Sequence, residues 1–225
     1  MKSFLIRAED KNIWERRTPI VPANLKEILS KTKANVFVQR SEKRFFPSQE
    51  YESVGAQLCD DMAQGDIIFG IKEIPEQKIL ADKIYLFFSH TIKGQSGNMP
   101  ILKKIISGGS TLIEYEKISD TQGQRLICFG RYAGDAGAID IMWLMGEYWH
   151  HKGITTPFSQ CKQATNYNSV KDAQDHFREI GELIKKQGIP KAISPLIIGI
   201  LGYGNVSLGA QQIFDCLILL KEKLQ

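Results

Sequence analysis

Two basic side chains follow apolar runs of the kind that form buried strands. Lys72 comes directly after IIFGI, and His90 follows IYLFF and one serine. A lysine beside a histidine suits a carbonyl or carboxylate substrate, because the ammonium stabilises negative charge on oxygen and the imidazole can exchange protons near neutral pH. Such a pair could carry out acid–base chemistry on an imine. The alternative is that both side chains are simply solvated where their strands end.

The elements that must position this pair alternate along the first 130 residues. The candidate strands are FLIRAE, NVFVQR, DIIFGI and KIYLFFS, with TLIEYE and RLICFG as two more on either side of a polar turn, SDTQGQR. Stretches with helical spacing lie between them: PANLKEILSKT, SQEYESVGAQLC and NMPILKKIISGG. This alternation predicts an α/β fold with a Rossmann-like, flavodoxin-like parallel sheet. If DIIFGI and KIYLFF are parallel neighbours, Lys72 and His90 lie at the carboxyl edge of the sheet, where such folds bind ligands.

The pattern of apolar and polar residues changes after Arg131, so we expect one domain over 1–131 and a second over 132–225. The second begins with a long helix, AGDAGAIDIMWLMGEYWHHKG, whose small residues predict close packing against another helix. A further helix is expected over 170–187. The run LIIGIL, at 196–201, reads as a strand that leads through Gly202 and Gly204 into a helix over 205–224.

Strand, glycine turn and helix together are typical of a phosphate site at a helix amino terminus. Ser207 stands where the six-residue dinucleotide fingerprint has its third glycine, which weakens the match. A complete dinucleotide domain also needs further parallel strands. We therefore expect the start of a truncated NAD(P)-binding Rossmann domain in 132–225.

Composition narrows the class of protein. The formal charge is +4, with 29 basic and 25 acidic residues mixed throughout, which favours a small-molecule substrate over nucleic acid. The four cysteines have no metal-binding spacing, so we expect no metal. The start lacks a leader-like apolar region and no run approaches the roughly 20 apolar residues of a membrane span, so we expect a soluble cytoplasmic protein. The oligomeric state stays open, a homo-oligomer included.

Several motifs, in order along nearly the whole chain, resemble one family. They are EDKNIWERRTPIVP, FFSHTIKGQ, EYEKISDTQGQRLICFGRYAGDAGAIDI, TTPFSQCKQATNYNS and GYGNVSLGAQQIF. Together they resemble the lysine–ketoglutarate reductase half of bifunctional aminoadipic semialdehyde synthase, which is related to lysine-forming saccharopine dehydrogenase and alanine dehydrogenase. The resemblance implies a substrate domain of the alanine dehydrogenase and transhydrogenase type, followed by a nicotinamide-binding domain.

The resemblance also implies roles for individual residues. By motif, Lys72 and His90 match the lysine and histidine that serve the substrate chemistry, and Arg17 matches an arginine that binds a substrate carboxylate, for which a bidentate fork is well suited. Glu73 and Glu116 match acidic residues that would tune the charge of the pair; the alternative is two surface carboxylates. By the same motifs, the cofactor phosphates would be held by Gly202, Gly204 and Asn205.

The implied activity is an oxidoreductase of lysine degradation. It would condense lysine with 2-oxoglutarate and reduce the imine with NADPH, giving saccharopine; the choice between NADP and NAD stays open, and we do not expect the chain to bind the cofactor fully by itself. The alternatives are a saccharopine dehydrogenase, an alanine dehydrogenase-like enzyme, or an inactive substrate-binding module.

Overall fold

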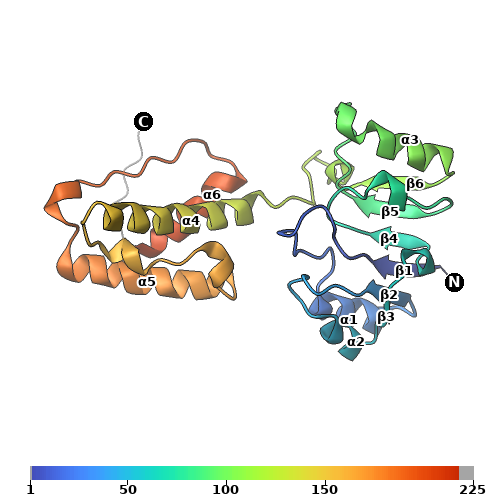
Figure 1. Cartoon of the computed structure of the whole chain (residues 1–225), viewed down its shortest axis with the longest axis horizontal. Coiled ribbons are helices and arrows are strands. Elements are labelled where there is room, and N and C mark those ends of the chain that lie inside the picture. Colours follow the sequence, from blue (N-terminus) through green and yellow to red (C-terminus); the bar gives the residue numbers. More distant parts are fainter. Residues whose placement is uncertain (1, 218–225) are drawn as a thin grey trace. The chain divides into compact units, whose positions relative to one another are not determined.

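The computed structural model describes residues 2–217, which belong to two compact units divided between Ile127 and Cys128. The first unit carries the strands, and the second is built from helices and loops in its described residues (Figure 1). Each unit has a hydrophobic core of its own.

One six-stranded parallel sheet forms the centre of the first unit, which confirms the predicted fold class. Its order is β3-β2-β1-β4-β5-β6. The strands are β1 (Ser3–Ile6), β2 (Asn35–Gln39), β3 (Gln57–Cys59), β4 (Ile67–Phe69), β5 (Ile84–Phe87) and β6 (Thr111–Glu114). The chain builds outward from β1 to β3, then returns to the other side of β1 with β4. The loops after β1 and β4 therefore diverge, as they do at ligand sites of open parallel sheets.

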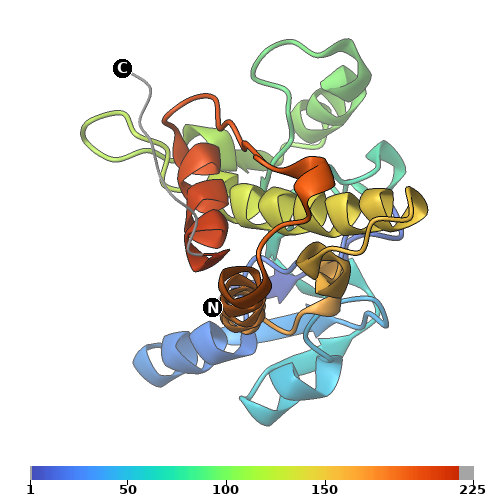
Figure 2. The ribbon, with the colours of Figure 1, turned by 90° about the vertical axis from the view of Figure 1, so that its left-hand side faces the viewer.

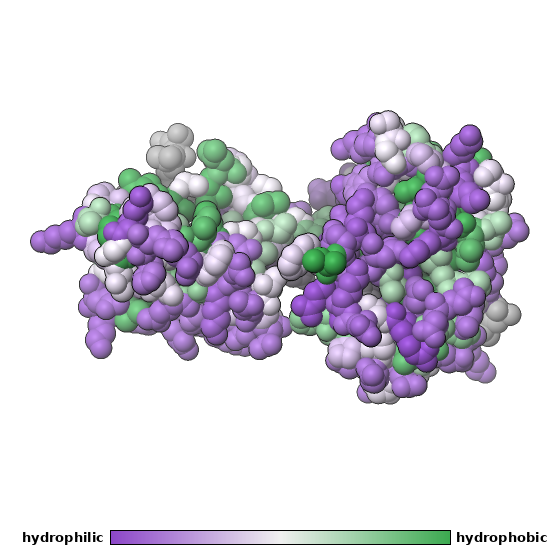
Figure 3. All heavy atoms as spheres, viewed as in Figure 1, coloured by the Kyte–Doolittle hydropathy of each residue, from purple (hydrophilic) through white to green (hydrophobic). Residues whose placement is uncertain are grey.

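Helices cover the sheet on its two faces, because side chains of a strand alternate between faces and both sides of these strands are apolar. Helices α1 (Pro22–Lys31) and α2 (Ser48–Ser53) pack on the face that carries Ile6 and Val38. Helix α3 (Met99–Ser107) packs on the opposite face, which carries Leu5 and Ile68. In Figure 3 the visible outer surface of this unit is mostly hydrophilic, as expected when the apolar side chains of the strands lie inside.

Two local predictions in this unit were wrong. The stretch SQEYESVGAQLC is not one helical segment: α2 ends at Ser53, Gly55 adopts a φ of +103°, and the chain then forms β3. A glycine reaches this left-handed region without the steric penalty of a side chain, so it allows the chain to turn from helix to strand. RLICFG does not form a strand, and the polar turn before it closes with a single antiparallel bridge between Ser119 and Arg125.

In the residues that the structure describes, the second unit packs three α-helices around one core. They are α4 (Gly130–His151), α5 (Val170–Gln187) and α6 (Asn205–Phe214). The long helix and the helix over 170–187 are both confirmed. Helix α5 begins where the Ser169 side chain accepts a hydrogen bond from the backbone N–H of Asp172. Figure 2 looks onto this unit and shows α6 beside the first half of α4.

Glycines allow α4 and α6 to approach closely, as the small residues of α4 predicted. A Cβ atom on Gly134 would lie 2.0 Å from the carbonyl oxygen of Val206, and one on Gly209 would lie 2.0 Å from that of Arg131. Since the atoms in the way belong to backbone, they cannot move aside as a flexible side chain would. The crossing of α4 and α6 therefore requires glycine at both positions.

The predicted strand at 196–201 is absent, and this segment is a loop. A strand needs a neighbour to satisfy its backbone groups, and the described residues 128–217 supply none. Its side chains are unevenly placed: Leu196 and Ile198 pack against the core, whereas Ile197 is 83% exposed and Leu201 fully exposed. Of the predicted helix over 205–224, the structure has α6 and a 3-10 turn at Asp215–Leu217; residues 218–224 lie outside the described part.

Candidate active site

The carboxyl ends of β4 and β5 bring the loops of Lys72 and His90 together. The two strands are parallel neighbours, and the pairing continues past them, because Gly70 N–H donates to Leu86 O at 2.8 Å and Phe88 N–H to Ile71 O at 3.1 Å. Beyond this point the His90 ring meets Glu73, with 2.8 Å between Nδ1 and Oε1. The residue that follows Lys72 is thus hydrogen-bonded to the predicted histidine.

Glu73 fixes the protonation pattern of the His90 ring. Burial would raise the pKa of Glu73, but hydrogen bonds from its own backbone N–H and from His90, together with the charge of Lys11 at 3.5 Å, outweigh burial and lower it. An ionised carboxylate can only accept hydrogen bonds, so Nδ1 of His90 carries the proton. In the neutral ring Nε2 is then the atom with a lone pair, available to take a proton.

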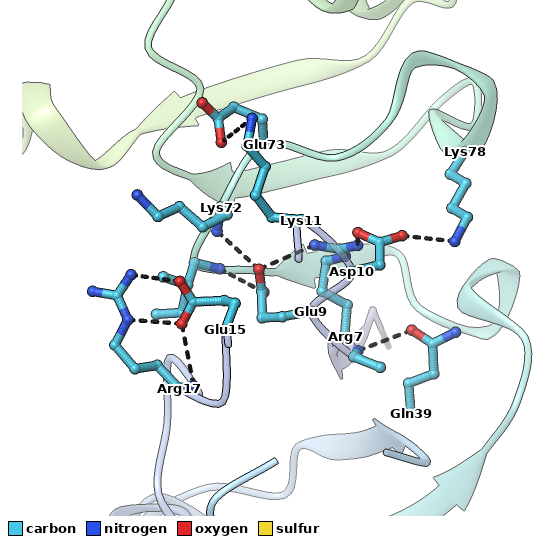
Figure 4. Close-up of polar contacts among 12 residues, drawn as sticks. Arg7, Glu9, Asp10, Lys11, Glu15, Arg17, Gln39, Lys72, Glu73 and Lys78 are labelled. Atoms are coloured by element: carbon cyan, nitrogen blue, oxygen red, sulfur yellow. Dashed lines mark hydrogen bonds and ion pairs between the residues drawn. The ribbon is translucent and has the colours of Figure 1, made fainter. Parts of the chain in front are cut away.

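Glu9 holds the loop that carries Lys72, and sequence reasoning missed it. Glu9 follows β1, and its side chain is 2% exposed and accepts the backbone N–H groups of Ile71 at 2.8 Å and Lys72 at 2.9 Å (Figure 4). Arg7 lies 3.3 Å from the same carboxylate. Burial raises the pKa of Glu9, against the lowering effect of Arg7 and the two N–H groups. The signal in the sequence is the charged triplet EDK, which begins three residues after the first apolar run, FLI.

Arg17 is paired with a carboxylate that sequence reasoning also missed. Its Nε donates to Glu15 Oε1 at 2.8 Å and its Nη2 to Oε2 at 2.6 Å, a bidentate pair that Figure 4 shows beside Glu9 and Lys72. Burial would raise the pKa of Glu15, but Arg17 and the charge of nearby Lys72 outweigh burial and lower it. Arg17, Glu15, Glu9 and Lys72 thus form one group of two positive and two negative side chains beside the carboxyl ends of β1 and β4.

The Glu15–Arg17 pair should make stability depend on pH. The folded-state pKa of Glu15 lies below its unfolded value of about 4.5, so the pair stabilises the fold above that pH and the contribution is lost as pH falls through the folded-state pKa. We expect Glu15→Gln to lower the free energy of unfolding more at pH 7 than at pH 3, as measured by urea unfolding. Glu27→Gln is the control, because the Glu27–Lys31 pair is exposed. Equal losses at both pH values in Glu15→Gln would contradict this assignment.

Glu116 does not join the Glu73–His90 pair in the described structure. Its Oε1 lies 3.4 Å from Nη2 of Arg125, across the base of the polar turn. Its neighbour Tyr115 is buried and packs edge-on against Phe88, with ring centroids 5.1 Å apart. Burial and the charge of Glu9 raise the pKa of Tyr115, so its phenol stays protonated.

Gly202, Gly204 and Asn205 belong to the second unit. Gly202 has a φ of +94°, Gly204 is the N-cap of α6, and Asn205 is the first helical residue. No side chain caps this helix start, and all three residues are exposed. Exposed N–H groups at a helix amino terminus, reached through glycines, suit a phosphate.

Comparison with known proteins decides the family. The model described as "Alanine dehydrogenase/PNT, N-terminal domain" matches residues 5–136, more than half of the chain. The chain belongs to the alanine dehydrogenase/PNT N-terminal domain family. The match runs from the middle of β1 past the end of β6, and it includes all five site residues predicted in the first unit.

Relatives of this alanine dehydrogenase/PNT chain include longer proteins. It is 42% identical over 217 residues to alpha-aminoadipic semialdehyde synthase of Arabidopsis thaliana, covering 94% of this chain and 20% of that protein. The mitochondrial alpha-aminoadipic semialdehyde synthase of Rattus norvegicus is 40% identical over 210 residues, covering 93% and 23%. Saccharopine dehydrogenase [NAD(+), L-lysine-forming] of Neurospora crassa is 34% identical over 208 residues, covering 90% and 54%. The chain thus spans about a fifth of the first two relatives.

Solved structures agree on the fold. An L-alanine dehydrogenase superposes with a TM-score of 0.52 at 17% identity, covering 66% of this chain and 42% of that one. A transhydrogenase from Sinorhizobium meliloti gives 0.52 at 19% identity, covering 65% and 44%. These two similarities confirm the α/β Rossmann-like fold of this chain.

Within residues 2–217 no helix combines the length and apolar character that crossing a bilayer demands. The same residues contain no group of three or more histidine, cysteine or acidic side chains that could hold a metal ion.

Proposed function

We propose that this chain carries the substrate site of a lysine–ketoglutarate reductase, at which lysine and 2-oxoglutarate condense and the imine is reduced to saccharopine. The observation that carries the proposal is the junction of β4 and β5, where Lys72 precedes a Glu73–His90 hydrogen bond. The relatives named alpha-aminoadipic semialdehyde synthase support it, since the resemblance covers more than nine-tenths of the chain.

The side chains suit the proton transfers of imine chemistry. Condensation of an amine with a ketone passes through a carbinolamine, which needs a proton on the departing oxygen and loses one from nitrogen. Lys72 would stabilise negative charge on the carbonyl oxygen, and His90, with Nδ1–H held by Glu73, would exchange protons through Nε2. Glu15 and Glu73 are acidic neighbours that would offset the positive charge of this region and suit an ammonium-bearing substrate.

The residues present also fit a nicotinamide cofactor. Gly202, Gly204 and Asn205 would hold its phosphates at the uncapped start of α6. NADPH, when bound, supplies the hydride that reduces the imine. We also propose that the enzyme uses NADP rather than NAD and that it is located in the cytoplasm.

Arg17 should matter for substrate affinity. In the proposed site its guanidinium would be shared between Glu15 and a substrate carboxylate, so Arg17→Ala should raise KM for a carboxylate substrate about tenfold, with a smaller change in kcat. Arg16→Ala is the matched control, because Arg16 is exposed and bonds the Lys43 carbonyl. If KM stays at its wild-type value in Arg17→Ala, the residue is structural.

A second candidate is the lysine-forming saccharopine dehydrogenase reaction. The Neurospora crassa relative with that name favours it, since the match at 34% identity covers 90% of this chain. Saccharopine with NAD+ tests this candidate, whereas lysine, 2-oxoglutarate and NADPH test the first. Pyruvate with ammonium and NADH tests alanine dehydrogenase activity.

Assays of cofactor oxidation or reduction with these substrate sets, followed at 340 nm, are the decisive experiment. Calorimetric titration of the chain with NADPH separates an enzyme from a substrate-binding module. Turnover with lysine plus 2-oxoglutarate is expected from a protein that joins this chain to a complete dinucleotide-binding domain, and micromolar NADPH binding by the chain alone would favour an enzyme. Binding of 2-oxoglutarate without NADPH binding or turnover would favour a substrate-binding module.

A further inference from the structure

His90 has an unusual backbone conformation. Its φ is +52°, and among residues 2–217 Asp82 is the other non-glycine residue with positive φ. This left-handed region is unfavourable for a residue with a side chain and persists only where the surroundings hold it. The residues that hold His90 in place are therefore part of what aims its ring at Glu73.

A hydrogen-bonded network fixes the residues on both sides of His90. Ser89 and Thr91 are buried, at 0% and 8% exposure. The Ser89 backbone N–H donates to Glu114 Oε2 at 2.8 Å, and the Ser89 hydroxyl donates to the same oxygen. Because that hydroxyl has one hydrogen, it must accept from Thr91, whose Oγ1 lies 2.8 Å away and whose N–H lies 3.3 Å away.

Glu114 is the end point of this network. It is the last residue of β6, which pairs with β5, and its carboxylate is 7% exposed. Besides the two donors of Ser89, it accepts the backbone N–H of Glu116 on Oε1 at 3.1 Å. Three donors directed at one buried carboxylate require both of its oxygens to act as acceptors.

We propose that Glu114 is a positioning residue for His90, an inference that rests on the proposed role of His90 in the reaction. Through Ser89 and Thr91, Glu114 holds the loop in the left-handed turn that directs Nδ1 to Glu73. The loop of Lys72 is held in the same way, since Glu9 accepts the N–H groups of Ile71 and Lys72. Lys72 and His90 thus each lie in a loop whose backbone is held by a buried carboxylate, from Glu9 just after β1 and from Glu114 at the end of β6.

The substitution Glu114→Gln tests this, because the amide has nearly the same shape but places an N–H group where an acceptor is needed. The readout is the pair of ring nitrogens of His90 in the 15N-histidine-labelled chain, which has four histidines. The His90 signals are identified by their loss in His90→Ala. In the wild type the Nδ1–H tautomer gives the two ring nitrogens of His90 well-separated 15N chemical shifts. In Glu114→Gln we expect the difference between these two shifts to decrease, because the hydrogen bond to Glu73 is lost.

Asp66→Asn is the matched control. Asp66 also accepts a backbone N–H and a hydroxyl from one serine, Ser3, but at the amino edge of the sheet. It should change stability without moving the His90 signals. Ser89→Ala is the second variant, in case Glu114→Gln does not fold: it keeps the bond from the Ser89 N–H and removes the hydroxyl link to Thr91, so a smaller shift in the same direction is expected.

The proposal would be overturned if the His90 signals were unchanged in a folded Glu114→Gln variant and in the Ser89→Ala variant. It would also be overturned if the Asp66→Asn variant changed the His90 signals as much as Glu114→Gln does. Turnover gives the second readout: Glu114→Gln should lower kcat roughly ten- to a hundredfold with little change in KM, the pattern of a misplaced group. The two failures are distinguishable. Lack of turnover in the wild type would count against the proposed function, while the nitrogen shifts test the positioning role without any substrate.

Discussion

Replacing Lys72 with Met or His90 with Ala should lower the rate of saccharopine formation about a hundredfold or more, the usual scale for losing a general acid or base. Met retains most of the length of Lys72 but no charge, so the carbonyl oxygen would lose its stabilising ammonium. Ala removes the ring that Glu73 orients. The measurement is kcat from NADPH oxidation at saturating lysine and 2-oxoglutarate, in the full-length enzyme with a complete dinucleotide-binding domain.

Lys93→Met is the control for Lys72→Met, since Lys93 is an exposed lysine in the loop that follows β5. It should retain wild-type turnover. If Lys72→Met and His90→Ala both keep rates near the wild type, neither residue takes part in the chemistry. A loss in His90→Ala alone would leave Lys72 with a role in substrate affinity.

The largest expected effect on stability is at the crossing of α4 and α6. Gly134→Ala would place a Cβ atom 2.0 Å from the Val206 carbonyl oxygen and 2.8 Å from the Ala210 nitrogen, so the helices must separate. Overpacking of this kind costs about 1–3 kcal/mol or more. Gly137→Ala, on the same helix, meets no atom within 4 Å and should stabilise α4 by about 0.5–1 kcal/mol.

Urea unfolding followed by tryptophan fluorescence can measure both variants. Trp143 and Trp149 lie on α4, and Trp14 lies in the first unit, so a Trp14→Phe background restricts the signal to the second unit. Opposite signs for Gly134→Ala and Gly137→Ala are expected. Similar midpoints for the two variants would show that the helices do not cross as closely as described.

Five of the six strands could be predicted because each is a short apolar run bounded by polar residues, and strand alternating with helix leaves few topologies; β3, with the sequence QLC, lacks such a run and was missed. The same reasoning placed Lys72 and His90 at one edge, since both follow such runs. It failed at 196–201, where LIIGIL has the composition of a strand but the described residues of its unit offer no partner. Strand pairing is a tertiary property that a local pattern cannot supply.

The supporting carboxylates could not be predicted individually. Glu9, Glu15 and Glu114 are ordinary acidic residues in the sequence, and their importance comes from backbone N–H groups or an arginine brought to them by the fold. Glu116 shows the converse, because the resemblance placed it in the site whereas its ion pair in the structure is with Arg125. Sequence patterns identify reactive groups better than the residues that orient them.

The proposed reactive residues Lys72 and His90 follow β4 and β5 at the carboxyl edge of the sheet, so the amino ends of the strands are the better place for a label. Asn35 and Gln57 begin β2 and β3 there and are exposed. In a Cys128→Ser background, which removes an exposed native thiol, a fluorophore or an immobilisation tag attached through a cysteine at either position would report on folding or tether the protein to a surface. Since the strands separate the two edges, such a label should leave substrate access unobstructed.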